Sequence, residues 1–187
     1  MWISRTKDGI VTVLDTEEGK VTGRRNVWTG LNRPHGLAFD PTNPDMLYIA
    51  EEDKIVRSLV ATTKPTPLEK IIDLPRGGGH FTRTIGFGPD GRLYVSIGSS
   101  CNVCIEKDER RAKIYSMKKD GSDFKEYARG LRNAVFFTWD ATGNLLVTEM
   151  GRDLLGDDLP PDEINIIEPG KNYGWPICYG KNIHDTQ

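Results

Sequence analysis

Three groups of polar residues in this sequence are of types suited to catalysis or cation binding. His80 follows three glycines in GGGHFTRTIGF, and histidine is the side chain best able to take a proton near neutral pH. Arg132 and Asn133 are adjacent, and a guanidinium beside an amide suits an anionic, oxygen-rich ligand. The segment RDLLGDDLPPDE, residues 152–163, offers hard oxygen ligands of the kind Ca²⁺ prefers, without the spacing of an EF-hand.

Each group also has a plain structural explanation. A histidine can simply cap the entry of a strand, and an Arg-Asn pair can belong to a solvated turn. An acidic loop is more often solvated than bound to a metal. The segments alone therefore leave both interpretations open, and the choice depends on the elements that position them.

A repeat in the sequence predicts those elements. Three segments begin with polar residues and continue as an apolar strand, a turn and a second apolar strand; they are residues 33–52, 80–99 and 132–151. Phe39, Phe87 and Trp139 occupy equivalent places in them. Two of the turns read Pro89-Asp90-Gly91 and Ala141-Thr142-Gly143, where glycine supplies the positive φ of a tight hairpin. The repeat places His80 and Arg132 at equivalent starts of inner strands.

Each unit continues into further strands towards its outer edge. Third strands are expected at 54–60, 112–121 and 163–170, and fourth strands at 67–74 and 124–131. Four strands in about 50 residues are typical of a β-propeller blade. Residues 8–30 are expected to form an outer hairpin whose inner strands would precede residue 1. The sequence therefore predicts an all-β fold of four-stranded antiparallel blades, forming an incomplete propeller ring of about 3.5 blades in one domain, residues 1–187.

The composition excludes some partners. The net charge of −2, with 28% charged residues, provides no broad basic field for nucleic acid. No apolar run approaches the roughly 20 residues that span a bilayer, and no signal peptide is visible at the N-terminus. Cys101 and Cys104 suit a local disulfide or half of a metal site, but a second Cys-x-x-C is absent, so zinc is not expected.

Specific motifs resemble a known family. The segments GGHFTRTIGFGPDGRLYVSIGSSCNVC, GLRNAVFFTWD and DEINIIEPGKNYGWPICYG are similar to those of the soluble PQQ-dependent sugar dehydrogenases, which are six-bladed propellers that include glucose, aldose and sorbosone dehydrogenase-like proteins. The resemblance runs over essentially the whole chain, which would lack part of the first blade and roughly the last two. It implies oxidation of the anomeric hydroxyl of aldose-type sugars to lactones, by hydride transfer to the quinone of PQQ.

The resemblance also implies roles for individual residues. His80 matches the general base, and Ser99 stands where soluble glucose dehydrogenase has an aspartate that orients it. A serine can fix the imidazole tautomer but cannot stabilise imidazolium by charge. Arg132 and Asn133 match a pair that meets the cofactor, with Arg132 also stabilising the developing oxyanion.

The resemblance further implies calcium at two places. Gly151 and Arg152 match a Gly-Pro pair whose carbonyls hold the Ca²⁺ that touches PQQ. Glu163, with the backbone carbonyl of Tyr173, matches a structural calcium site. The implied partners are a sugar and an electron acceptor, and the implied location is periplasmic or secreted.

Two other classes of function remain open. A calcium-dependent propeller lactonase would need a cage of Glu, Asn and Asp side chains at the axis. A non-catalytic or truncated propeller would need only the strands, and on its own it would be a poor enzyme. The open edges of an incomplete ring would also invite self-association.

Overall fold

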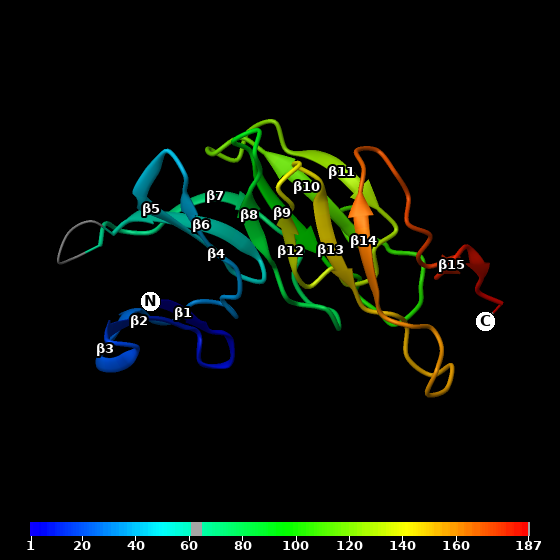
Figure 1. Ribbon diagram of the computed structural model, residues 1–187, viewed down its shortest axis with the longest axis horizontal. Helices are drawn as coiled ribbons and strands as arrows, with labels where there is room; N and C mark the ends of the chain where they lie inside the picture. The colour runs from blue at the N-terminus through cyan, green and yellow to red at the C-terminus, as the bar shows by residue number, and fades with distance from the viewer. Residues whose placement is uncertain (61–64, 187) are drawn as a thin grey trace.

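The structure, a computed structural model, describes residues 1–60 and 65–186 as a series of antiparallel sheets (Figure 1). The first sheet contains β1 (Trp2–Arg5), β2 (Ile10–Glu17) and β3 (Lys20–Trp28). The second contains β4 (Leu37–Asp40), β5 (Asn43–Ala50), β6 (Lys54–Leu59) and β7 (Glu69–Asp73). The third contains β8 (Ile85–Phe87), β9 (Leu93–Ile97), β10 (Lys113–Met117) and β11 (Lys125–Arg129).

The fourth sheet contains β12 (Phe137–Trp139), β13 (Leu145–Glu149) and β14 (Glu163–Ile167), and a short hairpin of β15 (Cys178–Tyr179) and β16 (Ile183–His184) follows it. A single turn of 3-10 helix, η1 (Thr6–Asp8), joins β1 to β2. In the described part of the chain, no helix has the length and apolarity needed to cross a bilayer. The predicted all-β class and the predicted four-strand repeat are therefore confirmed, in sheets that make up part of a propeller.

The first sheet corrects one expectation. Residues 8–30 do form an outer hairpin, β2 and β3, but one further strand of this sheet lies within the chain and pairs with β2. Residues Trp2–Arg5 form that strand, with Trp2 opposite Val13 and Arg5 opposite Ile10. This four-residue strand was missed because it is too short to show a clear alternation of apolar and polar side chains.

An aspartate lies in the first hairpin of each repeat and fixes its turn. The Oδ1 atoms of Asp40, Asp90 and Asp140 accept hydrogen bonds from the main-chain N–H two residues later, at 2.8, 3.1 and 2.9 Å. These Asx turns are a local alternative to strand pairing. Gly91 and Gly143 then adopt φ of +74° and +88°, as their turns require.

Apolar side chains fill the space between successive sheets. One core cluster lies between the second and third sheets, around Ile55, Leu93 and Met117, and another lies between the third and fourth, around Ile114, Leu145 and Ile167. β4 lies beside β8, as neighbouring inner strands of a ring do. This stacking brings the polar segments that precede β8 and β12 to the same end of the sheets.

The opposite face of the fourth sheet has no sheet against it in the described structure. Its side chains include Phe136, Ile164 and Ile166, which are 61%, 78% and 58% exposed. Figure 1 shows this sheet and the β15–β16 hairpin at the C-terminal end of the row of sheets, while β1–β3 lie at the other end.

Candidate functional site

His80 lies in the segment that precedes β8, and its imidazole is held by Ser99. Nδ1 of His80 is 2.8 Å from Ser99 Oγ and 3.1 Å from the main-chain oxygen of Ser99. The hydroxyl of Ser99 donates its own proton to the main-chain oxygen of Cys101, at 2.7 Å. Because both Ser99 oxygens must then accept, Nδ1 carries the proton, and Nε2 keeps the lone pair of a base.

The pKa of His80 lies below its ordinary value of 6.5. Burial is the largest cause, and the positive charge of Arg132 lowers the pKa further. The Ser99 carbonyl and the carboxylates of Asp153 and Glu106 act in the opposite direction. The imidazole is therefore neutral, and able to accept a proton, at neutral pH.

We expect NMR titration to show that His80 titrates below pH 6.5 as the Nδ1–H tautomer. The unfolded state binds this proton more tightly than the folded state does. The stability linked to His80 is therefore present above pH 6.5 and is lost as the pH decreases towards the pKa of the folded state. Asp153→Asn should lower the pKa further, since it removes a charge that raises it. An apparent pKa above 6.5 in the folded protein would contradict the arrangement.

Two buried arginines hold the main chain around His80. Arg83, which is 0% exposed, donates to the carbonyl oxygens of Pro75, His80 and Thr82 at 2.7, 3.0 and 2.8 Å. Arg111 donates to the carbonyls of Arg76, Gly77 and Gly98. The N–H of Gly77 in turn donates to Glu52 at 2.6 Å. The position of His80 is thus set by buried charged side chains beneath a glycine-rich segment.

Arg132 and Asn133 lie on the other side of Ser99 from His80. The N–H of Ser99 donates to the carbonyl of Arg132 at 2.7 Å. A Cβ added to Gly98 would lie 2.6 Å from His80 Cβ and 2.8 Å from Asn133 Oδ1, so only glycine allows these groups to approach so closely. The three residues implied by the resemblance therefore meet around the end of β9.

The guanidinium of Arg132 is engaged by the protein itself. Arg132 is 3% exposed, and its five N–H groups are accounted for by Asn102, Met150, Gly151 and Asp153. The bond to the Gly151 carbonyl is 2.8 Å long. The Asn133 amide donates to the sulfur of Met150. The Arg132 guanidinium therefore points no free donor at a ligand in this arrangement.

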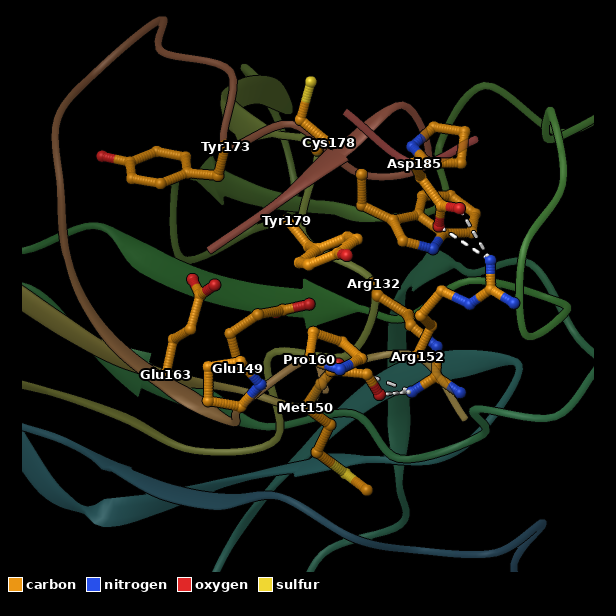
Figure 2. A pocket seen from close by; sticks show the side chains of 15 residues that line it. Arg132, Glu149, Met150, Arg152, Pro160, Glu163, Tyr173, Cys178, Tyr179 and Asp185 are labelled. Atoms are coloured by element: carbon orange, nitrogen blue, oxygen red, sulfur yellow. Dashed lines mark hydrogen bonds and ion pairs between the residues drawn. The ribbon is translucent and has the colours of Figure 1, made fainter. Parts of the chain in front are cut away.

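A pocket beside Arg132 contains a pair of glutamates (Figure 2). Glu149 and Glu163 are directly opposite each other on β13 and β14. Glu149 is 8% exposed; its Oε1 accepts from the N–H of Asn133, whereas its Oε2 is buried without a partner among the described residues. Burial raises the pKa of Glu149 to about 8, and the charge of Glu163 adds to this. The pair is thus short of positive charge.

The remaining metal residues implied by the resemblance line the same pocket, in different situations. Arg152 forms a buried ion pair with Asp185, with 2.8 Å to each carboxylate oxygen, drawn dashed in Figure 2. The Tyr173 ring points away from the glutamates and its hydroxyl donates to the carbonyl of Ile166. Its main-chain carbonyl is the group that the resemblance assigns to calcium.

The pocket offers a hard cation one residue of an implied site, Glu163, together with Glu149, to which the resemblance assigned no calcium. Glu149 and Glu163 supply carboxylate oxygens, one of them buried and without a donor, which suits Ca²⁺. The Gly151 carbonyl instead faces the Arg132 guanidinium, which repels a metal ion at that oxygen. The structure therefore favours a cation at the glutamate pair over one held by Gly151 and Arg152.

The pocket does not fit PQQ. The space that its lining leaves for a ligand in this arrangement is about 30 Å³, far less than a cofactor of several fused rings needs. A cofactor with three carboxylates needs cationic donors, and those of Arg132 are all engaged. No step through PQQ is therefore derived from these residues.

Sequence patterns missed several residues that build this site. Arg83 and Asn102 lie within the segment of residues 78–104 that carries the family resemblance, but no role was attached to them there, and Arg111 lies outside the quoted motifs. Glu149 did carry a signal: it has the same strand parity as Leu145 and Val147, which face the core. A carboxylate at a core-facing position predicts either a hydrogen-bonding partner within the protein or a bound cation.

The Cys-x-x-C forms a disulfide between Cys101 and Cys104. This settles the two alternatives left by the sequence in favour of the local disulfide. Cys178 is a free, half-buried thiol in the pocket lining.

Relatives of this chain match between half and nearly all of its length. An uncharacterised protein from Borreliella burgdorferi is 38% identical over 95 residues, covering 50% of this chain and 25% of that protein. Quinoprotein glucose dehydrogenase B of Acinetobacter calcoaceticus is 25% identical, covering 96% of this chain and 48% of that enzyme. The chain thus spans at most about half the length of these relatives.

Solved structures share the fold. The PQQ-bound form of aldose sugar dehydrogenase from Streptomyces coelicolor superimposes with a TM-score of 0.75 and 24% identity, over 98% of this chain and 62% of that one. The PQQ domain of pyranose dehydrogenase from Coprinopsis cinerea gives a TM-score of 0.81 with 21% identity, over 93% and 51%. The family model for glucose/sorbosone dehydrogenases matches residues 50–187, well over half of the chain. The chain therefore belongs to the glucose/sorbosone dehydrogenase family.

Proposed function

We propose that this protein takes part in oxidising the anomeric hydroxyl of aldose-type sugars to lactones, with His80 as the base. The observation that carries the proposal is the hydrogen bonding of His80. Ser99 and the Cys101 carbonyl fix the Nδ1–H tautomer, which leaves Nε2 as an acceptor. Membership of a family of sugar dehydrogenases supplies the substrate class.

The proposed reaction needs two transfers, and the described residues provide for one of them. Nε2 of His80 accepts the proton of the sugar hydroxyl as the C1–H bond breaks. The hydride goes to an acceptor, which is PQQ in the relative whose structure is PQQ-bound. Because the pocket does not fit PQQ, the residues that would hold it are not assigned within this chain.

Imidazolium formed on His80 would be only weakly stabilised. Ser99 carries no charge, and Arg132 opposes a second positive charge nearby, whereas Asp153 and Glu106 favour it. We therefore expect His80 to be a weaker base than a histidine paired directly with an aspartate. This difference follows from the serine at position 99 and does not depend on the cofactor.

Sugar binding provides the test. A panel of aldoses is added to the protein while the imidazole signals of His80 are followed by NMR, with His184→Ala as the matched histidine control. A saturable shift of the His80 signals, retained in the control, is expected. No response to any aldose would overturn the proposal, and hydrolysis of an added lactone without an oxidant would favour a lactonase.

We also propose that the glutamate pair binds Ca²⁺, and we expect added Ca²⁺ to raise the melting temperature. At about 100 times the dissociation constant the gain is roughly 2.7 kcal/mol, or roughly 5 to 10 °C for a chain of this size. Glu163→Gln should abolish most of this gain, whereas Glu168→Gln, a nearby exposed carboxylate, should leave it intact. A melting temperature insensitive to both Ca²⁺ and a chelator would rule out the site.

A further inference from the structure

The loop of residues 101–104, closed by the Cys101–Cys104 disulfide, places Asn102 where three segments meet. The main-chain oxygen of Asn102 accepts from Arg132 Nε at 3.0 Å and from Trp175 Nε1 at 3.2 Å. Its side-chain oxygen accepts from Arg132 Nη2 and from the N–H of Asp153, both at 2.8 Å. Its amide donates to the Asp153 carbonyl at 3.1 Å.

Asn102 is well suited to fix the plane of the Arg132 guanidinium. Two N–H groups on one edge of this buried guanidinium end on Asn102. The carboxylate partner of Arg132, Asp153, has a side chain that is 72% exposed, so solvent screens that ion pair. The two bonds to Asn102 join a buried charge to fixed neutral acceptors, and losing them would leave desolvated donors unpaired.

The same loop also holds His80, through the preceding residue. The carbonyl of Cys101 accepts the proton of Ser99, which makes Ser99 Oγ an acceptor for His80 Nδ1. Cys101 therefore holds His80 through Ser99, and its neighbour Asn102 holds Arg132 directly. The disulfide ties the two ends of this four-residue loop together.

We propose that Asn102 is a positioning residue for Arg132, and that the Cys101–Cys104 disulfide keeps Asn102 in place, so that a dithiol reductant loosens the site. The functional meaning of this arrangement rests on the proposed function, in which Arg132 lies beside the base His80. The positioning itself can be tested without any turnover.

The reduction step is balanced by the reductant. A dithiol supplies two electrons and two protons; the Cys101–Cys104 bond breaks to give two thiols, and the two sulfurs of the reductant join as a disulfide. The loop then loses its covalent closure, while the strands on either side keep their pairing.

The test measures hydrogen exchange in ¹⁵N-labelled protein at two pairs of donors. Nη2–H of Arg132 and the main-chain N–H of Asp153 donate to Oδ1 of Asn102, whereas Nε–H of Arg132 and Nε1–H of Trp175 donate to its main-chain oxygen. In Asn102→Ala, removal of Oδ1 should accelerate exchange of the first pair by at least about tenfold. Asn43→Ala, at the exposed start of β5, is the matched control and should change neither pair. In the reduced protein, and in Cys101→Ser/Cys104→Ser, both pairs should exchange faster and the single tautomer of His80 should be lost.

The other indole groups show whether an effect is local. Trp2, Trp28 and Trp139 should keep their exchange rates in every variant. Unchanged protection of Arg132 Nη2–H and Asp153 N–H in Asn102→Ala would overturn the proposal, and so would unchanged protection of Trp175 Nε1–H in the reduced protein. Equal acceleration of all four indoles would also overturn it, because that result indicates general unfolding. A failure of sugar to bind would leave these outcomes unaffected, so the two proposals fail separately.

Discussion

Purified residues 1–187, supplied with PQQ, Ca²⁺ and an aldose, are expected to reduce an artificial electron acceptor at less than about 1 turnover per second. Ordinary enzymes work at roughly 1 to 1,000 per second. The expected rate thus lies below this whole range. The measurement is a dye-reduction assay over a panel of aldoses and a range of PQQ concentrations.

The charges around the pocket are the first reason for this expectation. Glu163 and Asp185 line it, Glu149 is largely protonated at neutral pH because its pKa is raised to about 8, and the two arginines of the pocket are already bonded to protein acceptors. A cofactor with three carboxylates would meet more negative than available positive charge. Charge-assisted bonds to carboxylates are among the strongest that a protein can make, so their absence should weaken binding of PQQ severely.

Exposure to water is the second reason. The chain covers 48% of quinoprotein glucose dehydrogenase B, and one face of its fourth sheet, around Ile164, is open. Water in the site would screen each electrostatic contribution to catalysis. The exposed apolar face should also favour self-association, which sedimentation would detect.

A His80→Ala variant is the control for the assay. If the unmodified chain turns over at less than about 1 per second, His80→Ala should change the rate little, because the lack of charge-assisted contacts to PQQ limits it. Turnover in the ordinary range, abolished by His80→Ala, would show that these residues suffice as an enzyme and that our account of the pocket is wrong.

The repeat allowed most of the fold to be predicted from the sequence. Strand pairing within a blade is local and follows the alternation of apolar residues, so the third strand at Lys54–Leu59 and the fourth at Glu69–Asp73 could be placed. The aspartates at 40, 90 and 140 mark the same turn in each blade. The strand at Trp2–Arg5 carried too short a pattern to be found.

The site was less predictable, because it depends on contacts between segments distant in the sequence. His80 and Arg132 were placed at equivalent strand starts, and the structure does bring them together around Ser99. The Arg132 guanidinium bonds to the Gly151 carbonyl, where it competes with a metal ion. This contact depends on how the loop of residues 151–163 folds back. No local pattern encodes that path.

The second large effect concerns stability: we expect Arg83→Met to lower the free energy of unfolding by about 3 kcal/mol. Methionine fills a similar volume but donates no hydrogen bond. It would leave the carbonyls of Pro75, His80 and Thr82 without this donor, and each unpaired buried acceptor costs about 1 to 3 kcal/mol.

An opposing contribution keeps the expected loss below the sum of the three bonds. Arg83 is fully buried, and its Nε–H has no partner among the described residues, so removing the guanidinium also removes a desolvation cost. Arg83→Lys should be intermediate, because an ammonium keeps the charge but cannot reach all three carbonyls from one nitrogen.

Urea unfolding followed by circular dichroism measures the change, with Arg129→Met as the matched control. Arg129 is half exposed and pairs with Glu126 on the same strand, so its loss should cost less than about 1 kcal/mol. Equal midpoints for Arg83→Met and Arg129→Met would mean that the segment before β8 is held by its glycines and by Glu52 rather than by the buried guanidinium. A large loss of stability in Arg83→Met alone would instead show that the buried guanidinium holds the segment around His80.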